Sequence, residues 1–590
     1  MDISEVKNII TDKIAQAISN LYQKDLKELT LGFPPDLQLG DFAFGCFSLA
    51  KELKKNPAEI AKAIAQNIVK NLRPEGVLAQ VSAFGPYLNF KVKNQILFNA
   101  IAKDIADENF GTSKIGQGEK VMVEYLSPNT NKPLHLGHVR NGALGMAISN
   151  LFENAGYKVV KANLINDRGI HICKSMLAWK KWGNGETPES VKMKGDHFVG
   201  KWYVRYAEEA EKNPALENEI QEMLVKWEAR DPEIIALWEK MNSWVYAGFE
   251  ETYKKLGLVF DTIYYESETY KLGKEIVKKA LKDGIFTKQD DGAVIATFPP
   301  EFGLDQSGNQ KKITLLRTDG TSVYITQDLG TAVKKFSDYN LDRSIYVVGS
   351  EQEYHFKCLF TLLEMLGFPW ARECYHLSYG MVYLPEGKMK SREGKIVDAD
   401  DLISSMQELA REEIRSRDLE YTLSDQEVNE RALKIGLAAI KFYLLKVGPR
   451  QDIHFNPKES ISFDGATGPF CQYAYARASG ILRNAKGKGI TFEDYDDFSD
   501  LGSEEELNLA QKIIQFPMEV EKGVLEFNPS GIATITFEIS QAFNHFYQNQ
   551  PVLSAENENL IKSRLALVAA TMVAVKKGLN LLGIEVLEKM

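Results

Sequence analysis

The chain has few cysteines, and no two of them stand at a metal-binding or redox spacing. The five cysteines lie far apart in the 590-residue sequence, with no Cys-x-x-Cys motif: Cys46, Cys173, Cys358, Cys374 and Cys471. Structural zinc sites and disulfide-bonded secreted domains depend on closely spaced cysteines. We therefore expect reduced thiols, no structural zinc and a cytoplasmic protein.

A membrane-length apolar run, a leader peptide and an excess of basic residues are also missing. The most apolar run, residues 565–575, is far shorter than the roughly 20 residues that a membrane span needs. The opening residues have the pattern of an amphipathic helix, so we expect no leader and no membrane partner. The formal net charge of −10 argues against non-specific binding of polyanions, although lysines can still gather on one face.

The hydrophobic pattern changes along the chain and predicts a multidomain protein. Residues 1–112 combine a helix at 55–70, capped by Asn56, with two short strands around Gly85 and Pro86, a pattern that predicts a small N-terminal α+β domain. Residues 113–400 alternate apolar strands with helices, which predicts an α/β, Rossmann-like domain with a parallel sheet. Its strand candidates are VMVEYL, KVVKANLIN, AVIATF, KITLLRT, SIYVVGS and YHLSYGMVYL.

Two other regions are helical in pattern. Six of the seven tryptophans fall within residues 174–260, which predicts a helical insertion in the α/β domain with its own small core. Residues 401–460 have the pattern of a connecting helical region. Residues 461–590 have that of a C-terminal, all-α bundle.

A loop at residues 127–138, SPNTNKPLHLGH, joins a predicted strand to a predicted helix. Ligands of open parallel sheets bind at the carboxyl ends of the strands, where helix N-termini attract anions. His135 and His138 can donate hydrogen bonds to a phosphate there, since Gly137 removes a side chain between them, and Lys132 adds a positive charge. The alternative is a capping loop with incidental histidines.

A second cationic segment, YLPEGKMKSREGKIVDADDL, covers residues 383–402. It places Lys388, Lys390, Arg392 and Lys395 beside glycines after a strand. Such a loop can stabilise the charge that builds up on a leaving pyrophosphate. A solvated basic loop is the alternative.

The HLGH and KMKSR segments together resemble the signature pair of class I aminoacyl-tRNA synthetases. The surrounding blocks are similar to those of arginyl-tRNA synthetases, in the same order and over nearly the whole chain: VEYLSPNTNKPLHLGHVRN, YITQDLGTA, YVVGSEQEYHF, GPFCQYAYARA and LNLLGIEVL. The resemblance implies an enzyme that uses ATP with Mg²⁺ to form arginyl-adenylate, transfers the arginyl group to arginine tRNA, and releases AMP and pyrophosphate.

Such an enzyme needs a pocket for a guanidinium, which carboxylates match through its planar fork. Tyr324 and Asp328 stand four residues apart and would face the same way on a helical turn. Glu124 offers a second carboxylate, and Glu266 is a weaker candidate. Five residues match positions that the family uses for arginine: Glu124, Asn129, Tyr324, Asp328 and Gln352.

The resemblance also implies residues for the ATP side of the site. His135, His138, Lys388 and Lys132 are the expected catalytic residues, and Gly137, Lys390, Ser391 and His355 are expected to contact ATP. The family's usual loop is Lys-Met-Ser-Lys-Ser, and here Ser391 takes the place of the second lysine. Either Lys132 or Lys390 would then replace that lysine.

The flanking domains resemble the family's tRNA-binding modules. The N-terminal domain would contact the outer corner of the tRNA through Phe84, Tyr87 and Asn89, and the C-terminal bundle would bind the anticodon with Tyr547 and Met590. Packing inside each domain is the alternative for these side chains. We expect a monomer that binds arginine, ATP and arginine tRNA. A class I synthetase for another amino acid and a non-catalytic tRNA-binding paralogue are the competing hypotheses.

Overall fold

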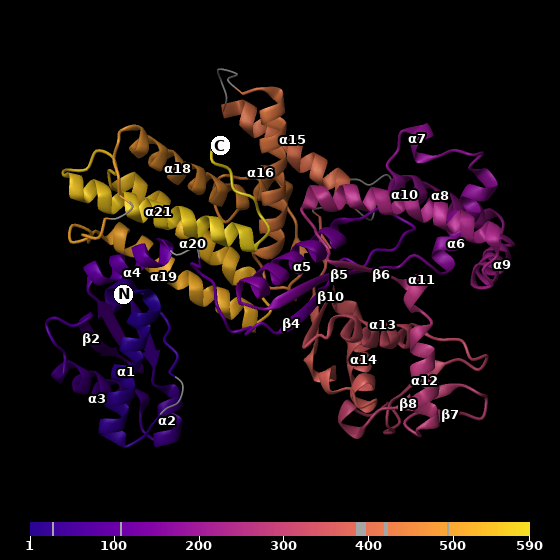
Figure 1. Cartoon of the computed structure of the whole chain (residues 1–590), viewed down its shortest axis with the longest axis horizontal. Helices are drawn as coiled ribbons and strands as arrows, with labels where there is room; N and C mark the ends of the chain where they lie inside the picture. Colours follow the sequence, from indigo (N-terminus) through magenta and orange to yellow (C-terminus); the bar gives the residue numbers. More distant parts are fainter. Residues whose placement is uncertain (26–28, 107–108, 385–396, 418–422, 493–494) are drawn as a thin grey trace. The chain divides into compact units, whose positions relative to one another are not determined.

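A computed structural model describes residues 1–25, 29–106, 109–384, 397–417, 423–492 and 495–590. The chain forms two compact units (Figure 1). The first consists of residues 1–113, 461–525 and 531–590, and the second of residues 114–460 and 526–530. Over the described ranges, the helices are all too short or too polar to pass through a lipid bilayer.

The N-terminal part of the first unit is a small antiparallel sheet covered by helices. Its strands lie in the order β1-β3-β2, and the predicted hairpin around Gly85 and Pro86 is confirmed as β2 and β3. The predicted cap is also confirmed, because the Asn56 side chain accepts a hydrogen bond from the Ala58 backbone N–H at 2.9 Å. The elements are α1 (Ile3–Tyr22), η1 (Leu37–Leu39), β1 (Phe42–Gly45), α2 (Phe47–Leu53), α3 (Pro57–Lys70), β2 (Leu78–Phe84), β3 (Tyr87–Val92) and α4 (Asn94–Ala106).

The C-terminal part of the first unit is entirely helical over its described residues, as expected. Helix α21 packs against α18, α19 and α4. Inside this bundle the buried Arg564 forms an ion pair with the buried Glu506 at 2.8 Å. The helices are α18 (Gly468–Gly487), α19 (Glu504–Leu525), α20 (Ser530–Asn549) and α21 (Glu558–Leu581).

The second unit is built on a five-stranded parallel sheet in the order β11-β10-β4-β5-β6. The chain starts in the middle at β4, runs outward through β5 and β6, and then returns to the other side of β4 for β10 and β11. Ligands of such sheets bind where the strand order reverses, which is here between β4 and β10. The strands are β4 (Lys120–Glu124), β5 (Lys158–Ile165), β6 (Thr262–Tyr265), β10 (Arg343–Gly349) and β11 (Cys374–Tyr379).

Two of the strands predicted for the parallel sheet belong elsewhere, and this is a correction. AVIATF and KITLLRT become β8 (Val294–Thr297) and β9 (Lys312–Leu316), which pair antiparallel with each other in a separate sheet, where β8 also pairs antiparallel with β7 (Thr287–Lys288). The cause is the connection between them, which holds only a short 3-10 turn, η2 (Pro300–Phe302), whereas a parallel pair needs a long crossover. The small strand β6, which follows the tryptophan-rich region, was missed.

The region from 174 to 260 is helical, as predicted. Helices α8 and α10 pack against each other, and α6 packs against α8 and α9. The helices are α6 (Ile170–Trp182), α7 (Pro188–Val191), α8 (Gly195–Lys212), α9 (Leu216–Glu228) and α10 (Pro232–Leu256).

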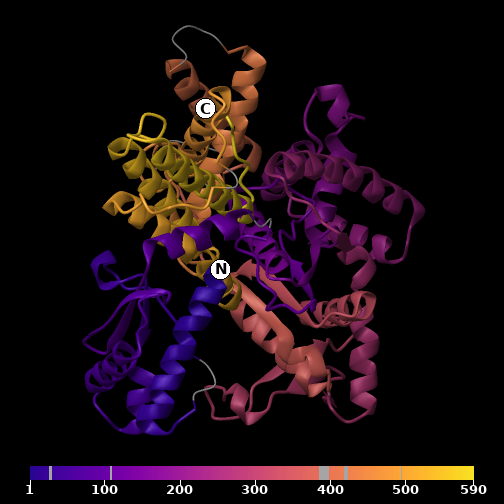
Figure 2. The ribbon, with the colours of Figure 1, turned by 60° about the vertical axis from the view of Figure 1, so that its left-hand side comes forward.

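After the sheet, two long helices, α15 (Ala399–Arg417) and α16 (Asp425–Leu445), lie side by side (orange in Figure 2). Both also pack against α5 (Leu136–Asn154), the helix that follows the histidine loop. The remaining short elements are α11 (Glu266–Thr269), β12 (Val382–Tyr383), β13 (Ile453–His454) and α17 (Pro457–Ser460).

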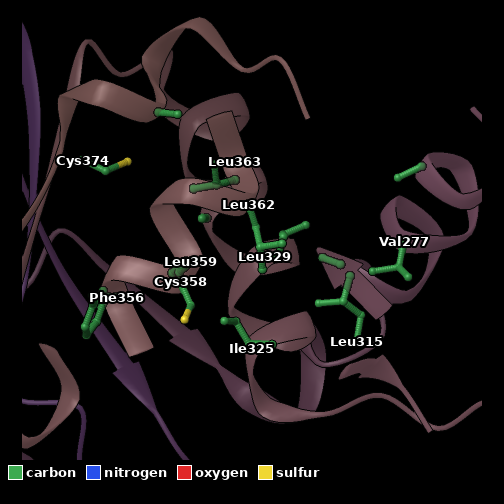
Figure 3. Close-up of a cluster of buried hydrophobic side chains, with 14 of the residues drawn as sticks. Val277, Leu315, Ile325, Leu329, Phe356, Cys358, Leu359, Leu362, Leu363 and Cys374 are labelled. Atoms are coloured by element: carbon green, nitrogen blue, oxygen red, sulfur yellow. The ribbon is translucent and has the colours of Figure 1, made fainter. Parts of the chain in front are cut away.

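A hydrophobic core fixes the helices on one side of the parallel sheet. It joins α12 (Leu272–Lys282), α13 (Tyr324–Tyr339) and α14 (Glu353–Met365) to the small antiparallel sheet; two 3-10 turns, η3 (Ser350–Gln352) and η4 (Pro369–Glu373), flank α14. Figure 3 shows Leu329 of α13 facing Leu359 and Leu362 of α14, with Phe356 at the end of α14. Burial of these large side chains sets the rotation of both helices, and so the direction of the residues beside them.

Candidate active site

The two histidines of the HLGH loop form the N-terminal cap of α5. The His135 Nδ1 accepts a hydrogen bond from the Gly137 backbone N–H at 3.1 Å, and the His138 Nδ1 accepts one from the His135 N–H at 3.1 Å. Since both Nδ1 atoms accept, the hydrogen of each neutral ring is on Nε2. Both rings therefore have an Nε2–H left to donate to a ligand.

Burial keeps both imidazoles neutral. It lowers the pKa of His135 to about 4, with a further contribution from the Lys132 charge. Burial also lowers the pKa of His138 well below its usual value, helped by His135 and Lys132. Neutral donors can hold an anion without the desolvation cost of a buried imidazolium.

Gly137 is required for the arrangement of the two rings. A Cβ at this position would lie 3.0 Å from the His135 Cε1, and the two ring centroids are only 3.9 Å apart. The prediction that this glycine makes room between the histidines is consistent with that geometry. Any larger residue would push the His135 ring away from the helix N-terminus.

The loop between β4 and the histidines is strained, and buried amides hold it. Leu126 and Ser127 have positive φ angles of 81° and 46°. The Leu126 N–H donates to the Asn141 Oδ1 at 2.6 Å, and the Ser127 N–H donates to the Asn163 Oδ1 at 3.1 Å. Such strain persists where surrounding contacts fix the backbone, and it clusters at functional sites. The sequence analysis missed both asparagines.

Arg140, two residues after His138, anchors the start of α5. It is completely buried, and its guanidinium donates to four backbone carbonyls. They belong to Gly380 (2.6 Å), Met381 (3.1 Å), Pro449 (2.9 Å) and Gln451 (2.6 Å). One side chain therefore joins α5 to the end of β11 and to the chain after α16. The sequence analysis missed this residue too.

Lys132 lies half-buried just before the histidines, and burial lowers the pKa of its ammonium. The other predicted cations of the ATP site, Lys388 and Lys390, lie outside the described residues together with Ser391, Arg392 and Lys395.

The predicted arginine-binding pair lies on α13, as its spacing indicates. The helix begins at Tyr324, whose side chain is 73% exposed, and Asp328 follows one turn later. The Asp328 Oδ2 accepts a hydrogen bond from the His355 Nε2 at 2.6 Å, so His355 already holds this carboxylate. Their neighbours Leu329 and Phe356 are buried in the core of Figure 3, which fixes the direction of both side chains.

Glu124 ends β4 and is buried. Its carboxylate forms an ion pair with the ammonium of Lys335, a residue of α13 that is also buried. The rings of Tyr264 and Tyr346 lie 5.8 and 4.9 Å from that ammonium. A buried carboxylate needs such a partner, because an unpaired charge is very costly to bury.

A cleft of about 1040 Å³ opens beside α13. Asn129, Tyr324 and Glu266 line it, whereas Glu124, Asp328 and Gln352, all described residues, lie outside its walls. Burial raises the pKa of Glu266 to about 7, opposed by Arg168, whose guanidinium lies 3.8 Å away. Lysines and arginines also line the cleft: Arg168, Lys271, Lys274, Lys278 and Arg317.

Gln352 lies at the end of η3, just before α14, and its side chain is exposed. This position follows the carboxyl end of β10, on one side of the point where the strand order reverses.

The predicted tRNA-contacting residues of the N-terminal part differ in exposure. Phe84 and Tyr87 flank the β2–β3 turn and are 65% and 44% exposed. Asn89 is buried in β3, and its side-chain NH₂ has no hydrogen-bond partner in the described structure. The exposed Phe47, which the sequence analysis missed, packs edge-on against Tyr87 with ring centroids 5.4 Å apart.

In the C-terminal bundle, Tyr547 of α20 is partly exposed and lies beside Arg477 of α18. The Arg477 guanidinium stands 5.4 Å from the Tyr547 ring and 4.7 Å from the Tyr473 ring, and it donates to the Asn544 Oδ1 at 2.6 Å. The sequence analysis missed Arg477 and Tyr473 as site residues. Met590 is the last residue and is half-buried.

Comparison with known families agrees with this geometry. The model of the tRNA synthetases class I (R) catalytic domain matches residues 100–456. The arginyl tRNA synthetase N-terminal domain matches residues 8–92, and the DALR anticodon binding domain matches residues 471–590. The five-stranded parallel sheet and the HLGH cap thus belong to a class I aminoacyl-tRNA synthetase.

Individual relatives specify the amino acid. The arginine–tRNA ligase of Treponema denticola is 44% identical and covers 99% of both chains. That of Bacteroides fragilis is 46% identical over 93% of this chain and 94% of its own. Arginyl-tRNA synthetase from Thermus thermophilus superposes with a TM-score of 0.80 at 25% identity, over 99% of this chain and 100% of its own.

The chain belongs to the arginyl-tRNA synthetase family. It activates arginine with ATP and charges tRNA with it.

Proposed function

We propose that the HLGH cap holds the phosphates of ATP during arginine activation. The observation that carries this proposal is the pair of neutral imidazoles at the N-terminus of α5, each with a free Nε2–H. The helix N-terminus adds its positive dipole end, and Lys132 adds a charge. Lys388, Lys390 and Ser391 are assigned to the same phosphates by the resemblance alone.

We propose that α13 provides the arginine pocket. The Asp328 carboxylate accepts the two N–H groups of the guanidinium, and Tyr324 packs beside it. Glu124 supplies a second carboxylate, while Asn129 and Gln352 bind the α-amino and carboxylate groups. His355, which the resemblance assigned to ATP, supports Asp328 from α14 through its 2.6 Å hydrogen bond.

The reaction then needs positioning rather than a general base, because the arginine carboxylate is already a nucleophile. Its oxygen attacks the α-phosphorus of ATP in line, and the bond from this phosphorus to the bridging oxygen breaks. Pyrophosphate leaves with that electron pair, and the two imidazoles and Lys132 oppose the charge that develops on it. Mg²⁺ enters as part of the ATP substrate complex. A terminal ribose hydroxyl of the tRNA then attacks the arginyl carbonyl and releases AMP.

The tRNA is proposed to use three surfaces. The cleft beside Tyr324 has Lys271, Lys274 and Arg317 on its walls, and these cations suit the phosphates of the 3′ end. Phe84 and Tyr87, extended by Phe47, offer stacking faces to an unpaired base of the outer corner, with Asn89 behind them. Tyr547 and Met590 of the C-terminal bundle contact the anticodon, with Arg477 beside Tyr547.

We further propose a monomer that works in the cytoplasm without structural zinc. The thiols support the part of this proposal that concerns zinc, since all five cysteines are free and buried. Burial raises the pKa of Cys46 and Cys173 to about 12, so these sulfurs are poor metal ligands.

Substitution of the histidines tests the ATP site. In His135→Asn and His138→Asn an amide replaces each ring, and the Nε2–H donors are lost. We expect kcat for tRNA charging to fall about 10²–10³-fold in each variant, with the arginine KM nearly unchanged. Steady-state aminoacylation with purified arginine tRNA measures both constants. His454→Asn, an exposed histidine of the same unit, is the control. Wild-type kcat in both site variants would refute the assignment.

A further inference from the structure

The strand-like stretch before α15 forms a short antiparallel pairing with the histidine loop. The Leu136 N–H donates to the Val397 carbonyl at 2.9 Å, and the Ala399 N–H donates to the Leu134 carbonyl at 2.9 Å. His135 thus lies opposite Asp398. The backbone position of His135 depends on where residues 397–399 are held.

Residues 397–400 are held in turn by the helical insertion. The Lys194 ammonium donates to the Asp400 Oδ2 at 2.7 Å, the Asp196 Oδ2 at 3.1 Å and the Thr252 Oγ1 at 2.6 Å. Asp196 and Thr252 are completely buried. Lys194 is the N-cap residue of α8, and Thr252 lies on α10. Side chains of both helices therefore bond to the segment that pairs with the histidine loop.

Two further side chains, His197 and Lys255, also contact the aspartates of this segment. The His197 Nε2 lies 3.2 Å from the Asp400 Oδ2 and 3.6 Å from the Asp398 Oδ2. The Lys255 ammonium lies 3.2 Å from the Asp400 Oδ1. Burial works against ionisation of Asp400, but hydrogen bonds from His197 and Lys194 lower its pKa. Asp400 is therefore charged at neutral pH and bound by two ammonium groups and one imidazole.

The spacing of Asp196, His197 and Asp400 would allow a metal ion, since their ligand atoms lie within 4.8 Å of one another. The Lys194 ammonium, however, already bonds to both carboxylates and occupies the space between them. A positioning role therefore explains the cluster better than a metal site.

Helix α8 also contacts the histidine loop on its other side. A Cβ at Gly200 would lie 2.8 Å from the Pro133 Cδ and 3.6 Å from the Lys132 Cα. The helix backbone therefore packs directly against the two residues that precede the HLGH motif. Helix α8 thus contacts residues 132–133, just before His135. Through Lys194 it also holds Asp400, next to the segment that pairs with the histidine loop.

We propose that the cluster of Lys194, His197, Asp398 and Asp400 positions His135 for the ATP step, so that the helical insertion controls the geometry of the ATP site. This inference depends on the proposed role of His135. The four are positioning residues, because they act through the backbone at 397–399, which pairs with the histidine loop. A small displacement of a reacting group is sufficient to slow a positioned reaction about 10²-fold.

Lys194→Met, Asp400→Asn and the double variant test the inference in the full-length enzyme with arginine tRNA. We expect each single variant to lower kcat about tenfold and to raise the ATP KM about threefold or more, with the arginine KM within about twofold. The double variant should lose less activity than the two single effects combined, because both single variants break the shared Lys194–Asp400 bond. Lys194→Arg, which keeps the charge, should recover most of the activity.

The control is Lys181→Met, which breaks an exposed ion pair with Glu219 in the same insertion and should leave kcat and both KM values unchanged. Single variants that lower the melting temperature but keep wild-type ATP kinetics would overturn the inference, as would equal rises in the KM of ATP and of arginine. If Lys194→Met does not fold, His197→Gln, which breaks the contacts with Asp398 and Asp400, replaces it, and unchanged ATP kinetics in that variant overturn the inference equally. Normal kcat in both His135→Asn and His138→Asn would instead refute the proposed ATP site.

Discussion

The proposed ATP side and the proposed arginine side of the site are organised in opposite ways. Around the histidine loop, neutral groups make the hydrogen bonds: two imidazoles cap α5, and Asn141 and Asn163 hold the strained backbone. On the arginine side, each carboxylate already has a cationic or imidazole partner. Glu124 pairs with Lys335, Asp328 with His355, and Glu266 with Arg168.

The difference teaches how each substrate must bind. In the proposed ATP site the hydrogen-bond donors are already in place, so reorganising the protein costs little free energy when ATP binds. In the proposed arginine site each carboxylate already has a partner, so the guanidinium has to share or replace that partner. A flat cation that makes bidentate hydrogen bonds can do this, whereas an ammonium makes fewer directed bonds.

The largest expected effect comes from Asp328→Ala. The variant removes the exposed carboxylate of the pocket, so kcat/KM for arginine should fall about 10³-fold while the ATP KM changes little. Steady-state charging at varied arginine measures the loss. Glu364→Ala, an exposed carboxylate of α14, is the matched control. An undiminished kcat/KM would show that the arginine pocket lies elsewhere, and the comparison of the ATP and arginine sides would no longer hold.

The second test separates the two possible roles of Glu124. Lys335→Met leaves a buried carboxylate unpaired, so the free energy of unfolding should fall by about 3–5 kcal/mol. Glu124→Gln combined with Lys335→Met should regain most of that stability. In this double variant, whose stability is restored, the arginine KM should still rise about tenfold if Glu124 binds the guanidinium.

Thermal unfolding and charging kinetics measure the two effects. Lys334→Met breaks an exposed ion pair on the same helix and should change stability by no more than about 0.5 kcal/mol. A normal arginine KM in the double variant would make Glu124 a counterion of Lys335 alone.

The smallest effect concerns pH. Glu266, whose pKa is raised to about 7, is neutral in acid and becomes charged as the pH rises. A charged carboxylate attracts the guanidinium, so the wild-type arginine KM should fall about threefold between about pH 6 and about pH 8. Glu266→Gln should flatten this change, whereas Glu268→Gln on the same short helix should not. A profile that is identical in Glu266→Gln and wild type would exclude Glu266 from arginine binding.

Local sequence signals predicted much of this molecule. The Asn56 cap, the hairpin at Gly85 and Pro86, and the histidine loop each depend on residues that are close in sequence. The spacing of Tyr324 and Asp328 was sufficient to place them on one helix. The division into α/β and all-α parts followed from hydrophobic periodicity.

Long-range partners could not be predicted in the same way. Glu124 and Lys335 are 211 residues apart, and their pairing depends on how α13 packs beside β4. The antiparallel pairing of β8 and β9 was not predicted because a short, largely apolar strand suits either kind of sheet. The bonds of Lys194 to Asp196 and Asp400 could not be predicted either, because they depend on how the insertion packs against the start of α15.

The buried Arg140 has a consequence for the dynamics of the enzyme. Its guanidinium binds carbonyls at residues 380–381 and at residues 449 and 451, so neither segment can leave α5 without breaking hydrogen bonds in a dry interior. Amide protons near these segments and in the first turn of α5 should therefore exchange with deuterated solvent at one common, slow rate, as a single cooperative opening.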